Sequence, residues 1–419
     1  MLDIQELREH PKEIEERLKT RDPSIELEEI LQLDQQRRST IQEVEELKAR
    51  RNRGSQEVAR RKEAGEDVDA LIASLSELAQ AISTKDETLK GLEPRLRSLM
   101  LTLPNLPHPS VPVGSKEQKV VLREHGEKPV ASFRVRSHLE IGEEKGLLDF
   151  RRGAMIAGTR FPMYVGAGAC LEMALIQFMF FHHVRNGYVP VLPPFLANET
   201  SFIVSSQLPK FADDIYHCEK DGLYLNPTAE SLLANLHRDE ILASEDLPLN
   251  YVAYTPCFRR EAGTYGEEER GLIRVHQFNK VELFKVTTPE TSYEALDRLV
   301  ADAEAVLRVL DLHYRVVVLP TEDMAQQSSK TIDLEVYLPA QERYYEVSSC
   351  SNCEAFQARR GSVRYRPAAG EKPRYVHMLN GSGLATSRLM AAILENNQTE
   401  DGRIRVPEAV REMVGAEAV

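Results

Sequence analysis

The sequence feature that most constrains the fold is a hydrophobic repeat near the N-terminus. Apolar side chains recur there at intervals of three and four residues, interrupted by one polar residue, Lys85. The repeat consists of Val68, Leu71, Leu75, Leu78, Ile82, Leu89, Leu92, Leu96 and Leu99. This spacing places one apolar stripe along a helix, and a second helix must cover the stripe to keep it from water.

A candidate for that second helix precedes the repeat. Residues 30–61 carry a weaker apolar repeat, and residues 63–67 (Glu-Ala-Gly-Glu-Asp) supply a turn between the two segments. We therefore predict that residues 1–103 form a helical domain, in which two long helices run antiparallel as a hairpin. We call this hairpin the coiled-coil arm.

The end of the first predicted long helix carries six basic residues, which we call the basic cluster. Its members are Arg50, Arg51, Arg53, Arg60, Arg61 and Lys62. Guanidinium and ammonium groups bind the phosphates of a nucleic-acid backbone. Charge runs are also common on solvated helix faces. On the residues alone, both interpretations stay open.

A proline-rich segment separates this domain from the rest of the chain. Pro104, Pro107, Pro109 and Pro112 break regular structure, so we predict a linker over residues 104–116 and a second domain over 117–419. The helices expected there span 171–185 and 292–310, and the strands span 251–258, 281–286, 315–319, 331–337 and 344–348. Strands joined by short loops predict an antiparallel sheet flanked by helices, and thus an α+β fold.

Composition narrows the class of protein. The formal net charge of -13 argues against an overall basic coat for nucleic acid. The first residues lack a basic, apolar leader and no run approaches 18 apolar residues, which predicts a cytoplasmic protein without a membrane partner. Five scattered cysteines suit a reducing compartment. Cys350 and Cys353 have the spacing of a zinc knuckle but lack a second pair, so we expect no structural zinc.

A predicted hairpin in the middle of the second domain carries side chains that could bind a ligand. Strand character around 251–259 and 277–286 flanks a loop that holds Gly263, Gly266 and Gly271. The residues at its two bases are Arg259, Glu261, His276, Phe278 and Glu282. A guanidinium can bind a phosphate with two hydrogen bonds and a Phe ring can stack on a base. Taken singly, each of these residues also fits a surface hairpin with ordinary ion pairs.

Three further clusters could carry chemistry. Asn226, Thr228 and Glu230 place a hydroxyl beside a carboxylate. Asp333 and Glu335, with Glu346 and Ser349 on a neighbouring strand, offer oxygen ligands for Mg²⁺. The stretch 380–388 is predicted to form a Gly-rich turn over 380–385 that enters a helix from about 386 to 397, with Arg388 in its first turn. Neither a Gly-x-x-x-x-Gly-Lys-Ser/Thr loop nor a Gly-x-Gly-x-x-Gly after a strand occurs, so those two ways of binding a nucleotide are excluded.

These stretches together resemble a known family. Residues 187–194, 257–282 and 377–388 resemble the three motifs of class II aminoacyl-tRNA synthetases. With the Thr228-Ala229-Glu230 triplet and the arm, residues 1–412 resemble a seryl-tRNA synthetase of the bacterial type. The resemblance implies that serine and ATP form an enzyme-bound seryl-adenylate, and that serine then passes to tRNA(Ser), with tRNA(Sec) as a further acceptor.

The resemblance also implies roles for individual residues. The catalytic set would be Arg259, Arg388 and Glu346, with Arg259 on the α-phosphate and the serine carboxylate and Arg388 on the γ-phosphate. The implied serine-binding residues are Thr228, Ala229, Glu230, Arg259, Glu282, Asn380 and Ser382. The implied ATP-binding residues are Arg259, Arg260, Glu261, Val275, His276, Gln277, Phe278, Glu346, Val347, Ser348, Ser349 and Arg388. Glu346 and Ser349 would hold Mg²⁺, and the basic cluster would bind tRNA across a homodimer.

Two loops depart from the family pattern. Val204, Ser205 and Ser206 stand where the family usually has Gly-Thr-Gly, and residues 322–329 lack the usual glycines. Fewer glycines restrict the backbone, so we expect these changes to affect substrate closure rather than the reaction. Two other functions fit parts of the sequence. A relative that loads a carrier protein would lack the arm, and a non-catalytic tRNA-binding protein would have lost Arg259, Glu282 or Arg388.

Overall fold

The computed structural model describes residues 1–262 and 270–419, so Gly263 and Gly266 of the predicted hairpin loop lie outside the described residues. The chain divides into two compact units. One comprises Leu2–Leu103, and the other comprises Pro104–Val419 together with Met1.

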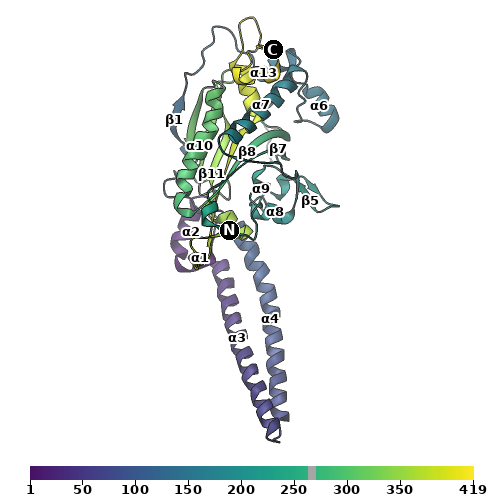
Figure 1. Cartoon of the computed structure of the whole chain (residues 1–419), viewed down its shortest axis with the longest axis vertical. Coiled ribbons are helices and arrows are strands. Elements are labelled where there is room, and N and C mark those ends of the chain that lie inside the picture. The colour runs from purple at the N-terminus through teal and green to yellow at the C-terminus, as the bar shows by residue number, and fades with distance from the viewer. Residues whose placement is uncertain (263–269) are drawn as a thin grey trace. The chain divides into compact units, whose positions relative to one another are not determined.

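The first unit is the predicted arm, and its hairpin is confirmed. It contains α1 (Ile4–Glu9), α2 (Pro11–Lys19), α3 (Glu28–Glu63) and α4 (Asp69–Thr102), with the two long helices lying side by side (Figure 1). Val68, Ile82 and Leu96 are buried, and the other residues of the apolar repeat are half-buried, whereas Ile72 beside the repeat is exposed.

Ion pairs between the long helices show that they are antiparallel. Glu29 pairs with Arg95, Arg37 with Glu93 at 3.3 Å, Glu43 with Lys85, and Lys48 with Asp86 at 3.7 Å. From Glu29 to Glu43 the partner on α4 moves toward the N-terminal end of that helix, and the partner of Lys48 lies next to that of Glu43. The pair with Glu43 also explains how Lys85 is accommodated within an apolar repeat.

The second unit is built on an eight-stranded sheet with the order β1-β9-β10-β11-β14-β8-β7-β2. Its strands are β1 (Val120–His125), β2 (Val189–Val191), β7 (Leu249–Phe258), β8 (Gln277–Thr287), β9 (Tyr314–Val318), β10 (Lys330–Leu338), β11 (Arg343–Asn352) and β14 (His377–Ala385). Neighbouring strands are antiparallel except for β2 and β7. The predicted α+β class with an antiparallel sheet is therefore confirmed.

Helices cover one face of the sheet. The helices α7 (Ala167–Arg185), α10 (Ser292–Val309) and α12 (Thr386–Asn396) share a core with side chains of β8 such as Val281 and Leu283. Because side chains alternate along a strand, Phe278, Lys280, Glu282 and Phe284 lie on the opposite face. Phe284 packs there in a second, smaller core. The sheet thus has one face committed to helix packing and one face free to carry polar groups.

Smaller elements complete the second unit. Two three-stranded sheets have the orders β13-β12-β6 and β3-β5-β4. Their strands are β3 (Leu196–Asn198), β4 (His217–Cys218), β5 (Leu223–Leu225), β6 (Ile241–Ala243), β12 (Arg364–Arg366) and β13 (Arg374–Tyr375). The short helices are α5 (His138–Glu144), α6 (Phe150–Ala157), α8 (Glu199–Val204), α9 (Glu230–Leu233), α11 (Phe356–Gly361) and α13 (Arg411–Val414).

The proline-rich segment predicted as a linker lies against the second unit. The amide N–H of Asn105 donates to the carbonyl of Gln326 at 2.8 Å, and the N–H of His108 donates to that of Ser329 at 2.8 Å. The Asn105 side chain also donates to the carbonyls of Gln327 and Cys353. These bonds hold the loop at 326–329 in place.

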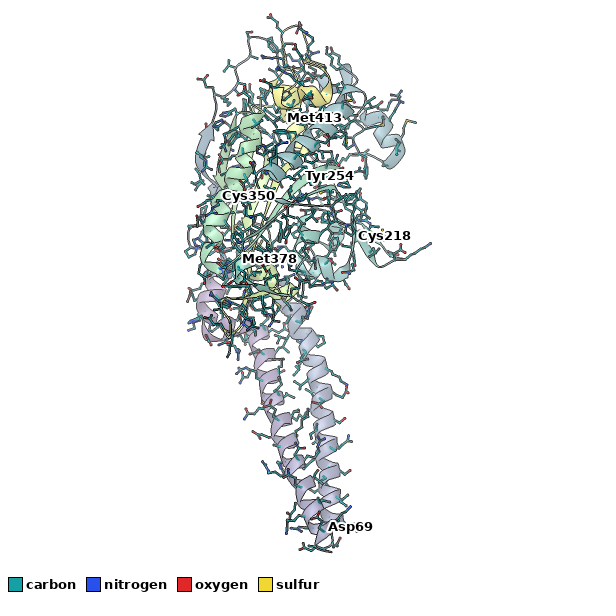
Figure 2. The ribbon with its side chains drawn as sticks, viewed as in Figure 1. Asp69, Cys218, Tyr254, Cys350, Met378 and Met413 are labelled. Carbon is teal, nitrogen blue, oxygen red and sulfur yellow. The ribbon has the colours of Figure 1, made fainter. Side chains whose placement is uncertain are left out.

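The Gly-rich turn predicted over residues 380–385 is wrong, because these residues form the end of β14. Their glycines permit close packing instead of a turn. A Cβ atom at Gly381 would lie 2.9 Å from Sγ of Cys350, which is labelled in Figure 2, and one at Gly383 would lie 2.9 Å from Nε2 of His183. Glycine within a strand often marks such a close approach. The predicted helix follows directly as α12.

Helix α7 contradicts the expectation that no segment is long and apolar enough to span a membrane. By length and composition alone it could do so, but half of the qualifying window is buried in the fold. Leu171, Leu175 and Met179 of this helix belong to the main core. A core helix of a globular protein satisfies the same criterion.

Candidate active site

A cavity of about 450 Å³ lies in the second unit, lined by residues from β8, β11, β14, the start of α12 and several loops, one of which directly follows β7. It collects most of the residues that the sequence singled out. The predicted residues in its lining are Thr228, Glu230, Arg259, Glu261, Val275, Phe278, Glu346, Val347, Ser349, Asn380, Ser382 and Arg388. The sheet register explains this convergence, because β8 pairs with both β7 and β14 while β14 also pairs with β11.

One end of the cavity is a buried network of charged and hydroxyl groups. Thr228 Oγ1 donates to Oε2 of Glu282 at 3.0 Å and accepts from Lys280 Nζ at 2.6 Å. Lys280 also forms an ion pair with Glu282, and both side chains are almost fully buried. Glu282 does not line the cavity itself but lies directly behind Thr228. Buried charges are stable only when paired in this way.

Glu230 is held in the same region by three amide groups. Its Oε1 accepts from Gln327 Nε2 at 2.8 Å and from Gln357 Nε2 at 2.7 Å, while its Oε2 accepts from Asn380 Nδ2 at 3.1 Å. Burial and the nearby charge of Glu282 raise the pKa of Glu230 to about 7. The amide donors act in the opposite direction because they favour the ionised carboxylate. Glu230 therefore changes charge close to neutral pH.

Two arginines mark the other part of the cavity. Arg259 Nε donates to the carbonyl of Pro227 at 3.3 Å, and its guanidinium lies 5.2 Å from the centre of the Phe278 ring. Arg388 Nε donates to the carbonyl of Ile273 at 3.0 Å. Its Nη1 donates to the carbonyl of Glu346 at 2.8 Å and lies 3.3 Å from Oε2 of the same residue. Both guanidinium groups are thus fixed in position by backbone carbonyls.

Oxygen atoms near Arg388 suit a hard divalent cation. Glu346 and Ser349 lie on β11 and both line the cavity. Ser349 stands opposite Asp333 in the sheet register, and burial together with the charge of Glu346 raises the pKa of Asp333 well above its ordinary value. Mg²⁺ commonly takes one or two protein oxygens and completes its shell with phosphates and water. Glu346 and Ser349 fit that pattern, because each offers a side-chain oxygen atom. Within residues 1–262 and 270–419, no group of three His, Cys, Asp or Glu could hold a metal ion alone.

The two cysteines with zinc-knuckle spacing, Cys350 and Cys353, are both buried free thiols. Cys353 Sγ donates a weak hydrogen bond to Asn380 Oδ1 at 3.7 Å, so it supports a residue of the cavity wall. That the chain needs no structural zinc stays a prediction.

Besides Glu282, five predicted residues of this site lie outside the lining: Ala229, Arg260, His276, Gln277 and Ser348. Arg260 Nε donates to the carbonyl of Ile215 at 3.2 Å, and its guanidinium stacks on Tyr216. His276 Nδ1 contacts the carbonyl of Arg259 at 2.9 Å, which fixes the base of the hairpin. Gln277 is exposed because strand alternation turns it away from Phe278. Ser348 and Ala229 are buried beside residues that do line the cavity.

Three residues that bind Glu230 or Glu282, namely Lys280, Gln327 and Gln357, were not predicted from the sequence. Lys280 had a usable signal, because it alternates with Phe278 and Glu282 along one strand and must share their face. No pattern in the sequence indicated Gln327 or Gln357. They reach Glu230 from a loop and from α11, and only the tertiary fold brings them there.

The basic cluster lies in the C-terminal half of α3. Arg50, Arg53, Arg60 and Lys62 are exposed, and Arg51 and Arg61 are half-exposed. Arg60 and Arg61 both pair with Glu57 at 2.7 Å. Hydrogen bonds from these two arginines lower the pKa of Glu57 to about 2, so the carboxylate stays charged. Even so, basic groups outnumber acidic ones on this segment.

Comparisons with known proteins agree on one family. Residues 1–107 match the model of the seryl-tRNA synthetase N-terminal domain, and residues 216–397 match that of the class II tRNA synthetase core domain for Gly, His, Pro, Ser and Thr. Serine-tRNA ligases from Geobacter sulfurreducens and Geotalea uraniireducens are each 50% identical over 99% of this chain and 99% of their own. The crystal structure of seryl-tRNA synthetase from Pyrococcus horikoshii complexed with ATP has a TM-score of 0.95 at 37% identity, covering 100% of this chain and 99% of that one.

Proposed function

Because the chain belongs to the seryl-tRNA synthetase family, we propose that the cavity on β8, β11 and β14 is where L-serine and ATP react. The activity of the chain is the formation of seryl-adenylate from these substrates, followed by transfer of serine to the 3′ end of tRNA(Ser). The relatives match the arm as well as the catalytic unit. A protein that loads a carrier, or one that only binds tRNA, is thereby set aside.

We place serine at the buried end of the cavity. Its ammonium group is attracted by the carboxylates of Glu230 and Glu282, and its carboxylate by Arg259. Asn380 and Ser382 of β14 lie in the same wall, so they complete the binding site. A buried polar pocket of this kind refuses alanine, because the analogue that lacks the hydroxyl leaves protein groups without a partner.

The triphosphate then lies along the two arginines. Arg259 binds the α-phosphate, where the serine carboxylate attacks, and Arg388 binds the γ-phosphate. The Phe278 ring provides an apolar face on which adenine stacks. The attacking carboxylate is already ionised, so the reaction needs alignment and charge neutralisation more than a proton acceptor. We therefore assign no general base.

Glu346 and Ser349 hold Mg²⁺ in this proposal. The ion, when bound, neutralises negative charge on the phosphates. The residues of the chain do the rest of the positioning: Arg388 is anchored by the carbonyl of Ile273, and the carboxylate of Glu346 stands next to it. Arg388 can bind a phosphate oxygen directly, whereas Glu346 would act on the phosphates only through the ion that it would hold.

The observation that supports this proposal best is that Arg259, Glu346 and Arg388 line one cavity with Thr228 and Glu230. The experiment is serine-dependent exchange of pyrophosphate into ATP, compared with alanine, threonine and glycine. Arg259→Ala should lower kcat/KM by more than about 100-fold, the size of effect expected for one preorganised charge contact. Arg298→Ala removes an exposed guanidinium of α10 and serves as the control. Exchange that is equally fast with all four amino acids would contradict the proposal.

We also propose that the basic cluster binds the backbone of tRNA(Ser), with tRNA(Sec) as a second acceptor. RNA helices are recognised mainly through shape, phosphates and 2′-hydroxyls rather than base edges. Six basic side chains on a long helix suit that mode. Because aminoacylation of tRNA takes place in the cytoplasm, we place the chain there.

A homodimer is the remaining part of the proposal. Large apolar side chains are exposed on α7, on the strand β2 that packs beside it, and directly after that strand. They are Met173, Phe181, Val189 and Leu192. Exposed apolar groups gathered on neighbouring elements mark protein interfaces. Light scattering of the purified chain tests this, and the mass of a monomer at micromolar concentration would contradict it.

A further inference from the structure

Gln327 occupies a position in the cavity that the proposed serine site does not yet use. Its side chain is 4% exposed and lines the cavity. Its Nε2 donates to Glu230 Oε1 at 2.8 Å, and its backbone carbonyl accepts from Asn105 Nδ2 at 2.9 Å. Side chain and backbone are therefore both held, and the amide cannot move away without breaking a buried hydrogen bond.

The other end of this amide has no partner. Gln327 Oε1 is buried and makes no hydrogen bond with any residue in the described part of the chain. In its ionised form Glu230 accepts hydrogen bonds only, so the NH₂ group of Gln327 must face it and the amide oxygen must face elsewhere. A buried acceptor without a donor destabilises a protein, and such an atom in a ligand cavity calls for a ligand donor.

Gln357 provides an internal comparison. Its Nε2 donates to the same Oε1 of Glu230 at 2.7 Å and also to the carbonyl of Ser205 at 3.2 Å. It is fully buried and does not line the cavity. The two glutamines thus give Glu230 the same kind of support, but only Gln327 is placed to meet a substrate.

The groups of serine divide between the available acceptors by charge. An ammonium cation is stabilised most by carboxylates. Glu282 has a buried Oε1 without a hydrogen-bond partner among the described residues, whereas its Oε2 is bound by Thr228 and Lys280. A neutral amide oxygen suits a neutral hydroxyl donor. On the basis of the proposed serine site, we propose that Gln327 Oε1 accepts the hydrogen bond of the serine side-chain hydroxyl. Gln327 is then a specificity-determining residue.

The test compares matched variants in the full chain. Gln327→Met and Gln357→Met each replace an amide by an unbranched apolar side chain of similar length, and each removes one donor to Glu230 Oε1. Pyrophosphate exchange is measured with serine and with alanine. Q327M should lower the serine-to-alanine ratio of kcat/KM by about 10- to 100-fold, the range for leaving one buried hydrogen bond unmade. Q357M should lower the rate with both amino acids while leaving their ratio within about threefold of wild type.

The outcomes separate this inference from the proposed function. Wild type without serine-dependent exchange would refute the function itself. Normal exchange by wild type, with the same serine-to-alanine ratio in Q327M and Q357M, would overturn the role of Gln327 alone. Circular dichroism and thermal melting show whether each variant is folded. Should Q327M not fold, Gln327→Asn keeps the amide but draws its oxygen back from the cavity, and the same fall in the ratio is expected.

Discussion

The arm and the active-site sheet hold their charged side chains in opposite ways. On the arm, Lys85 pairs with Glu43 and Arg37 with Glu93, and all four side chains are at least one-third exposed. In the sheet, Glu282 is completely buried and its partner Lys280 is 7% exposed. Exposed pairs are weakened by water and salt, so none of them is essential. A buried charge depends on each of its partners. We therefore expect the arm to act through summed charge, and the site through individual contacts.

The largest effect should come from neutralising the basic cluster. Replacing Arg50, Arg51, Arg53, Arg60, Arg61 and Lys62 by Gln should lower aminoacylation of tRNA(Ser) by more than about 100-fold, because each lost phosphate contact weakens binding and reduces its salt dependence. Serine-dependent pyrophosphate exchange, which needs no tRNA, should stay unchanged. The two assays are run on one preparation.

Lys90→Gln with Arg97→Gln is the control for this change. Both residues are exposed on α4 and lie outside the basic cluster. If exchange fell as much as aminoacylation in the six-residue variant, the division of labour between arm and sheet would be wrong.

Variants of Glu230 test whether the activity of the site depends on a single buried group, in contrast to the summed charge of the basic cluster. Its pKa is about 7, so the ionised form that attracts an ammonium group becomes dominant as the pH rises through that value. In wild type, kcat/KM for serine should increase over this range. Glu230→Gln removes the charge and should lower kcat/KM by about 10- to 100-fold. The variant should also lose this part of the pH dependence. A profile of unchanged shape in the variant would assign the ionisation to another group.

Glu172 of α7 should show a smaller effect, on stability. Asn279 Nδ2 donates to its Oε1 at 2.8 Å, and the Thr386 hydroxyl donates to the same atom. Burial raises its pKa, so the folded state prefers the protonated acid. This contribution is complete below the ordinary pKa of a carboxyl group and is lost as the pH rises through the raised value. The stability of wild type relative to Glu172→Gln should therefore decline with increasing pH, as measured by urea unfolding.

Glu172→Ala serves as the second variant. It removes the acceptor itself and should cost about 1–3 kcal/mol at every pH, because Asn279 and Thr386 lose a buried partner. Equal stability of the Ala and Gln variants would show that these hydrogen bonds do not matter.

The smallest change should come from the arm, at Lys85. Lys85→Leu completes the apolar repeat and removes an exposed ion pair, so the melting temperature should rise by a few degrees at most. The difference should grow in high salt, where the ion pair of wild type is screened. A large loss of stability would mean that an exposed pair behaves like a buried one, and the contrast between the two regions would fail.

The sequence predicts the arm far better than the site. The three-and-four repeat of the arm is a local signal, and the expected helices end within a few residues of α3 and α4. Alternation likewise locates β8 and β10. The site depends on strand register, which no local pattern of this chain specifies. The sequence predicts a turn over 380–385, but glycine also permits close packing within a strand, as it does there in β14. The amides of Gln327 and Gln357 meet Glu230 only in the folded molecule.

The pairing of Arg388 with Glu346 has an energetic consequence for nucleotide affinity. The guanidinium already has a carboxylate and a carbonyl of one residue as hydrogen-bond acceptors. A phosphate oxygen that binds Arg388 must take over at least one of these bonds, so the observed affinity equals the intrinsic attraction minus the work of separating the resident pair. If Glu346 holds a cation as proposed, its carboxylate would no longer hold Arg388, and cation and nucleotide would favour each other's binding.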